Sequence, residues 1–135
     1  MPIIQVKFAT PAPAAPTPQA IAETVVRLTA EILRKRPDLT AVTIDEVPAT
    51  HWFVAGPSLA EQGKASFFLD IKIVDGTNTK DEKAAYVAAI FAAQRVIAPC
   101  PVQNISGPAA HQQIRAGPAC GDHDGWVKIT GWACA

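Results

Sequence analysis

The chain has little charge and no excess of either sign. Charged residues make up 18% of the 135 residues, and twelve Lys and Arg offset twelve Asp and Glu. This balance creates no strong field that would attract nucleic acid or an acidic membrane surface. Charged residues also interrupt the long apolar segments, and no basic region precedes a hydrophobic run. The sequence therefore predicts neither a signal peptide nor a transmembrane helix, and we expect a cytoplasmic protein.

Cysteine is also scarce. The three cysteines, Cys100, Cys120 and Cys134, are an odd set confined to the last third of the chain, which favours reduced thiols over a disulfide framework. Cys120 and Cys134, even with His111 and His123, lack the paired spacings of a structural zinc site. The sequence also lacks a nucleophile-elbow motif and a phosphate-binding glycine loop. We expect no metal and no cofactor, and we exclude standard hydrolases and nucleotide-binding domains.

Hydrophobic residues, at 49% of the chain, are sufficient for one domain with a single core. Residues 3–8 have the pattern of a buried strand. A helix follows, with Thr17 as N-cap and Pro18 in its first turn, and Pro37 is expected to stop it. A second strand is predicted at residues 41–47. A β-α-β unit of this kind has parallel strands.

The same order of elements recurs in the second half of the chain. Residues 67–74 alternate as a strand, and Thr79 with Glu82 forms a capping box for a helix that runs to about Ile97. Matching positions of the two halves are about 62 to 65 residues apart. Strand-like segments after this helix are limited to residues 102–105 and 126–130.

These patterns predict one α/β domain made of two β-α-β halves with pseudo-twofold symmetry. We assign residues 1–65 to the first half, 66–106 to the second and 107–135 to an irregular tail. The expected sheet is mixed and four-stranded, with both helices on one face. Four residues, Ile3, Val6, Ile71 and Ile73, are expected to make the opposite face too apolar for solvent, which predicts an oligomer.

Pro2 directly follows Met1 at the start of the first strand. Removal of Met1 would turn its nitrogen into a secondary amine. A free α-amino group has a pKa of about 8, and an apolar pocket lowers it, so the neutral amine could act as a general base. In the alternative interpretation Pro2 only follows an initiator methionine and has no catalytic role.

Pro2 at the head of a strand, the internal repeat, and residues 44–56, with Trp52 before a turn that ends at Gly56, together resemble the tautomerase superfamily. This superfamily includes 4-oxalocrotonate tautomerase, macrophage migration inhibitory factor and cis-3-chloroacrylic acid dehalogenase. The resemblance covers about residues 2–97. It implies a homotrimer with Pro2 as the catalytic amine. Phe67 stands where the second half would carry its own proline, so it also implies one active site per subunit.

By the same resemblance, cations near Pro2 would hold substrate carboxylates. The stretches that correspond to the family's arginines, residues 10–12, 41–43 and 74–78, contain no cation. Arg36, immediately before Pro37, has a place similar to that of a lysine in macrophage-migration-inhibitory-factor-like members. It could grip a carboxylate with two hydrogen bonds, or it could be a solvated charge that favours the helix C-terminus.

Two further residues have open roles. Trp52 could line the pocket or fill a subunit interface. Lys72 alternates with two isoleucines and should point to the opposite sheet face, where it could be solvated or line the pocket.

The leading hypothesis is a cofactor-independent tautomerase or isomerase acting on a small keto acid or enol. The alternatives are a hydratase, dehalogenase or decarboxylase that uses the same proline, and a non-catalytic trimeric binding protein. We expect no nucleic-acid or membrane partner.

Overall fold

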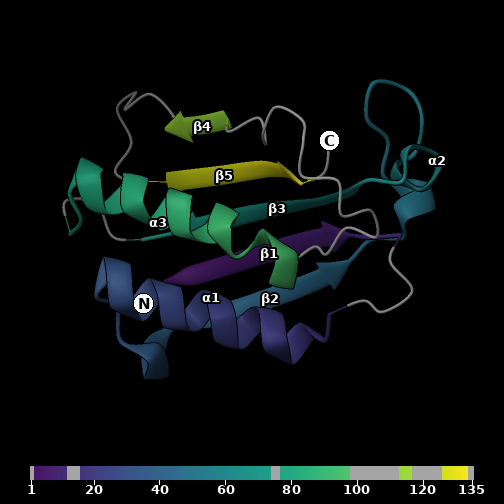
Figure 1. The fold of residues 1–135 in the computed structure, drawn as a ribbon. Helices are drawn as coiled ribbons and strands as arrows, with labels where there is room; N and C mark the ends of the chain where they lie inside the picture. The colour runs from purple at the N-terminus through teal and green to yellow at the C-terminus, as the bar shows by residue number, and fades with distance from the viewer. Residues whose placement is uncertain (1, 12–15, 74–76, 98–112, 117–125, 134–135) are drawn as a thin grey trace.

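The computed structural model describes residues 2–11, 16–73, 77–97, 113–116 and 126–133 (Figure 1). Two 3-10 turns connect its helices and strands, η1 (Pro37–Leu39) and η2 (Ala49–His51). The helices and strands in chain order are β1 (Ile3–Ala9), α1 (Pro18–Leu33), β2 (Ala41–Glu46), α2 (Leu59–Gln62), β3 (Ala65–Lys72), α3 (Lys80–Ala92), α4 (Gln94–Ile97), β4 (Gln113–Ala116) and β5 (Trp126–Ala133).

The strands form one mixed sheet in the order β2-β1-β3-β5-β4. β1 and β2 are parallel and are joined through α1, which confirms the predicted first β-α-β unit. β3 runs antiparallel to β1 on its other side. In Figure 1, α1 and α3 lie over the same face of this sheet. The α/β class and the mixed sheet are therefore as predicted.

The number of strands differs from the expectation. The described sheet has five strands rather than four, because β4 and β5 form within residues 107–135, which we expected to be an irregular tail. The predicted strand at 126–130 lies within β5, whereas residues 102–105 fall outside the described residues. Strands are stabilised by cross-strand neighbours, which the local pattern of a proline- and glycine-rich segment does not reveal.

The strand next to β3 does not repeat the arrangement of the first half. β5 is antiparallel to β3, whereas β2 is parallel to β1. The sheet thus does not confirm the pseudo-twofold symmetry, and the division of the chain into two halves and a tail also stays a prediction.

Both predicted helix starts are confirmed. The Thr17 hydroxyl accepts a hydrogen bond from the Ala20 N–H, with Pro18 in the first turn of α1. Thr79 and Glu82 form the reciprocal capping box of α3. These residues satisfy amide groups that have no partner inside the helix.

Both helix ends come earlier than expected. α1 ends at Leu33, because Arg34 adopts a left-handed conformation with φ of 55°. Arg34, Lys35 and Arg36 therefore lie beyond the last residue of the helix, and Pro37 does not stop it. α3 ends at Ala92, and only the short α4 reaches Ile97. Among the described residues, no helix combines the length and the apolar character needed to cross a membrane.

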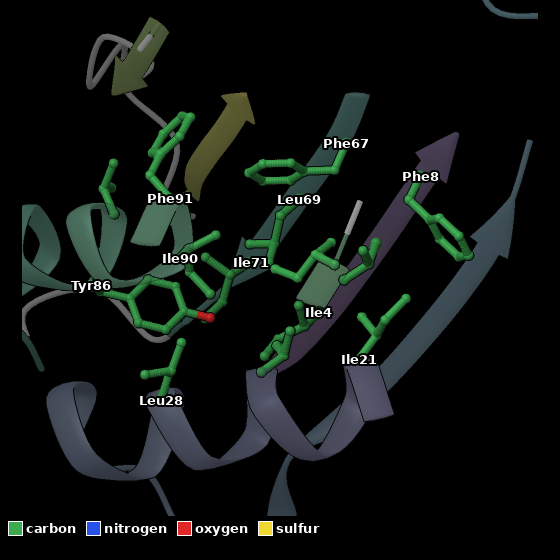
Figure 2. Close-up of a cluster of buried hydrophobic side chains, with 14 of the residues drawn as sticks. Ile4, Phe8, Ile21, Leu28, Phe67, Leu69, Ile71, Tyr86, Ile90 and Phe91 are labelled. Atoms are coloured by element: carbon green, nitrogen blue, oxygen red, sulfur yellow. The ribbon is translucent and has the colours of Figure 1, made fainter. Parts of the chain in front are cut away.

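The core lies between the sheet and the two long helices (Figure 2). β1 turns Ile4, Val6 and Phe8 toward the helices and leaves the alternate residues exposed. The core residues drawn with labels are Ile4, Phe8, Ile21, Leu28, Phe67, Leu69, Ile71, Tyr86, Ile90 and Phe91.

This arrangement corrects the expected apolar face. Val6, Ile71 and Ile73 are buried on the helix side, with 1%, 0% and 8% of their surface exposed, and only Ile3 is exposed, at 40%. Ile3 and Val6 are separated by an odd number of positions, so they cannot share a face of one strand. Three of the four residues that predicted an oligomer therefore belong to the core of the monomer.

Candidate functional site

Pro2 lies at the start of β1 and is buried. Its carbonyl accepts a hydrogen bond of 3.1 Å from the N–H of Ala41, the first residue of β2. The register of β1 also pairs Ile3 with Lys72, the last residue of β3. Pro2 is therefore flanked by the beginning of β2 and the end of β3, and we call this end of the sheet the proline end.

Arg36 lies at the proline end, because η1 connects it directly to the start of β2. Its guanidinium donates from Nε to Oδ1 of Asp38 at 3.1 Å and from Nη2 to Oδ2 at 2.5 Å. Both side chains are more than half exposed. The guanidinium that could bind a substrate carboxylate thus binds the carboxylate of Asp38 in the same chain.

Lys72 also lies at the proline end but faces away from the helices. It is exposed, and it pairs in register with exposed Ile3, whereas Pro2 shares the alternation of buried Ile4. The predicted orientation of Lys72 toward the opposite face is therefore correct. At the proline end, Pro2 therefore lies on the helix-covered side of the sheet and Lys72 on the opposite side.

Trp52 lies at the other end of the sheet. It follows η2 and β2, and the last residue of β2, Glu46, pairs with Phe8 near the end of β1. A strand rises about 3.3 Å per residue, so about 17 Å separates the levels of Ile3 and Phe8. In Figure 1 the N-terminus is at the left and α2, close to Trp52 in sequence, is at the right. Within one chain, Trp52 and Pro2 do not form one site.

Lys35 and the side chain of Asn78, whose contacts the sequence does not indicate, both help to join α1 to the start of α3. Lys35 Nζ donates to Thr77 Oγ1 at 2.7 Å. The Asn78 side-chain amide donates to the Leu33 carbonyl and to Glu82 Oε2, each at 3.1 Å. In Figure 1 the last turn of α1 and the first turn of α3 lie at the same side as the N-terminus, so this junction lies at the proline end.

Hydrogen bonds within the junction stabilise the charged form of Glu82. The backbone N–H of Thr79 and then the Asn78 amide stabilise the Glu82 carboxylate, which lowers its pKa below the usual 4.5. One side-chain amide thus caps the end of α1 and reinforces the capping box of α3. Asn78 has this role because the end of α1 and the start of α3 meet in the fold, and a local helix pattern does not indicate that contact.

Metal binding finds no support in the described ranges, where no group of three His, Cys, Asp or Glu side chains is placed to hold an ion. The cysteines and histidines considered from the sequence, Cys100, Cys120, Cys134, His111 and His123, lie outside those ranges.

Comparisons with known proteins point to one fold. No family model and no curated protein sequence matches the chain. Among solved structures, the chain is similar to a crystal structure described as native fused 4-OT, with a TM-score of 0.53 and 22% sequence identity. The match covers 70% of this chain and 74% of that one. 4-OT abbreviates 4-oxalocrotonate tautomerase, the first family in the resemblance drawn from Pro2 and residues 44–56. The chain therefore has the fold of fused 4-OT, as the resemblance predicted.

Proposed function

We propose that the protein is a cofactor-independent tautomerase or isomerase that uses the amine of Pro2 on a small keto acid or enol. The observation that carries the proposal is the buried position of Pro2 at the head of β1, in a chain whose fold is that of fused 4-OT. A buried amine is less easily protonated than one in water, because burial disfavours the ammonium form. Such an amine can accept a proton at neutral pH.

The chemistry would begin after Met1 is removed. The Pro2 nitrogen takes a proton from the carbon next to the substrate carbonyl, and the electron pair of that C–H bond forms a C=C bond. The carbonyl π electrons move to oxygen, and the protonated Pro2 amine delivers its proton to that oxygen, which gives the enol and restores the neutral amine. The reverse steps return the keto form. No redox change is needed, which is consistent with a cofactor-independent reaction.

A substrate-binding role of Lys72, which lies at the proline end, belongs to this proposal. Arg36 lies at the same end, but it could bind a substrate carboxylate only by giving up its bonds to Asp38. Trp52 can line the same site only if it comes from a second copy of the chain, because its own Pro2 is at the opposite end of the sheet. A homotrimer that places one copy's Trp52 next to another copy's Pro2 would meet this requirement.

The pairing of Arg36 with Asp38 favours a second candidate, a non-catalytic trimeric binding protein. If Asp38 holds Arg36 permanently, one cation expected for substrate binding is lost. A hydratase, dehalogenase or decarboxylase could use the same amine. Each would differ from a tautomerase in its substrate and in the bond that forms or breaks.

The test is enolisation of phenylpyruvate and ketonisation of 2-hydroxymuconate, which is already an enol, by protein shown by intact mass to lack Met1. Pro2→Ala is the matched variant, because it leaves a primary amine in place of the secondary one. We expect activity in the parent protein and at least a tenfold loss in Pro2→Ala. Equal activity of the two proteins would rule out Pro2 as the base, and absence of activity in both would favour the binding protein.

A further inference from the structure

Two neighbouring cations, Lys35 and Arg36, leave α1 in different directions. The left-handed conformation of Arg34 reverses the chain at the end of the helix. The backbone N–H of Lys35 still bonds to α1, through the Thr29 carbonyl at 3.4 Å, whereas the Arg36 carbonyl accepts from Leu39 in η1 at 3.1 Å. The two side chains are thus held by different elements.

The two cations also differ in their partners. Arg36 binds Asp38 and is largely exposed, with 72% of its side chain accessible. Lys35 is half-buried, and its partner is the uncharged hydroxyl of Thr77. Within the part of the chain that the structure describes, no carboxylate forms an ion pair with Lys35.

A line of hydrogen bonds fixes the position of the Lys35 ammonium. Thr77 Oγ1 accepts from Lys35 and donates to Asn78 Oδ1 at 3.3 Å, and the Asn78 amide is anchored to the Leu33 carbonyl and to Glu82. An ammonium has three N–H donors, and the bond to Thr77 uses one of them. Lys35 is therefore a positioned cation at the proline end, and no carboxylate among the described residues forms an ion pair with it.

We propose that Lys35, positioned by Thr77, forms the subsite that binds the substrate carboxylate, in place of Arg36. The inference rests on the proposed function for the identity of the ligand, a small carboxylate with an enolisable carbon. The existence of the anion subsite does not depend on the proposed function. Lys35 contacts the carboxylate, whereas Thr77 acts only by holding Lys35.

The first experiment compares phenylpyruvate with its methyl ester, which replaces the negative charge of the carboxylate by a neutral group. Lys35→Met and the neighbouring Arg36→Met are the matched variants. A charge-assisted hydrogen bond contributes enough that its loss should raise KM about tenfold or more. We expect this rise for Lys35→Met with phenylpyruvate but not with the ester, and a change below about twofold for Arg36→Met. Thr77→Val should raise the KM for phenylpyruvate by a smaller factor, and Lys35→Arg should recover most of the loss.

A carboxylate-specific rise in KM for Arg36→Met that exceeds that for Lys35→Met would overturn the assignment, as would an equal effect of Lys35→Met on both substrates. Thermal unfolding of each variant shows whether the fold is kept.

The second experiment does not depend on turnover. Phenylacetate, a carboxylate without the keto group, is titrated into protein lacking Met1, and the Hε–Cε signals of the lysines are followed by NMR. We expect a saturable shift of the Lys35 signal that is unchanged in Arg36→Met. The absence of such a shift would overturn the subsite even if the enzyme is active. A saturable shift in a protein without enolisation activity would support the subsite and reject the proposed function.

Discussion

Replacing Thr29 by Val should destabilise the protein more than replacing its partner, Tyr86, by Phe. Thr29 in α1 and Tyr86 in α3 are almost completely buried, with 0% and 1% exposed, and their hydroxyl oxygens are 3.1 Å apart. Thr29 Oγ1 also donates to the Val25 carbonyl at 2.7 Å. Because a threonine hydroxyl has one hydrogen, Tyr86 must be the donor in the contact between the helices. Figure 2 shows the Tyr86 ring in the core, with its hydroxyl oxygen directed into it.

Because Tyr86 donates to Thr29, the two single variants should lose different amounts of unfolding free energy. Thr29→Val removes the acceptor and leaves the Tyr86 hydroxyl buried without a partner, which costs about 1–3 kcal/mol. Tyr86→Phe removes the donor, but Thr29 keeps its bond to the Val25 carbonyl, so the cost is about 1 kcal/mol. The double variant has no orphaned hydroxyl, so its loss should be smaller than the sum of the single losses by about 1 kcal/mol or more.

The assay is equilibrium unfolding in urea, followed by circular dichroism at one fixed protein concentration. The concentration is fixed because assembly would contribute to the apparent stability. A Tyr86→Phe cost equal to or above that of Thr29→Val, or strictly additive losses, would refute the inferred donor.

Three further predictions concern charge. Burial raises the pKa of Tyr86 to about 12, so between pH 10 and 12 the folded form keeps a proton that the unfolded form, with a pKa near 10, has lost. The free energy of unfolding should therefore fall by up to about 3 kcal/mol across this range, and it should not do so in Tyr86→Phe. The pKa of Glu82 is lowered, so its contribution exists above the usual 4.5 and is lost as the pH falls through the folded value; acid unfolding of Glu82→Gln should lack this component. Asp38→Asn should release Arg36; if Arg36 rather than Lys35 binds substrate, the KM for phenylpyruvate falls, and if Lys35 does, it changes by less than about twofold.

The features predicted correctly from the sequence are those with local causes. The caps at Thr17 and at Thr79 with Glu82 depend on side chains that bond to amides within three residues, so spacing alone reveals them. The first β-α-β unit follows from a strand and a helix pattern joined by a short connection.

The features predicted wrongly or missed depend on tertiary pairing. β4, which no pattern indicated, and the part of β5 beyond residue 130 are stabilised by the strands beside them, and only register places Ile71 beside Ile4 in the core. The bond between Lys35 and Thr77 spans 42 positions in the chain, and no local pattern marks it. The Arg36–Asp38 pair is a different case, because a carboxylate two residues after the arginine was a signal that the sequence analysis did not use.

The most direct test of the central claim compares two forms of the same chain, one shown by intact mass to have lost Met1 and one shown to retain it. In the form that keeps Met1, the Pro2 nitrogen is a tertiary amide and has no useful basicity. Phenylpyruvate enolisation should therefore be present in the form without Met1 and nearly absent in the form with it, although both fold. Equal activity in the two forms would contradict the account.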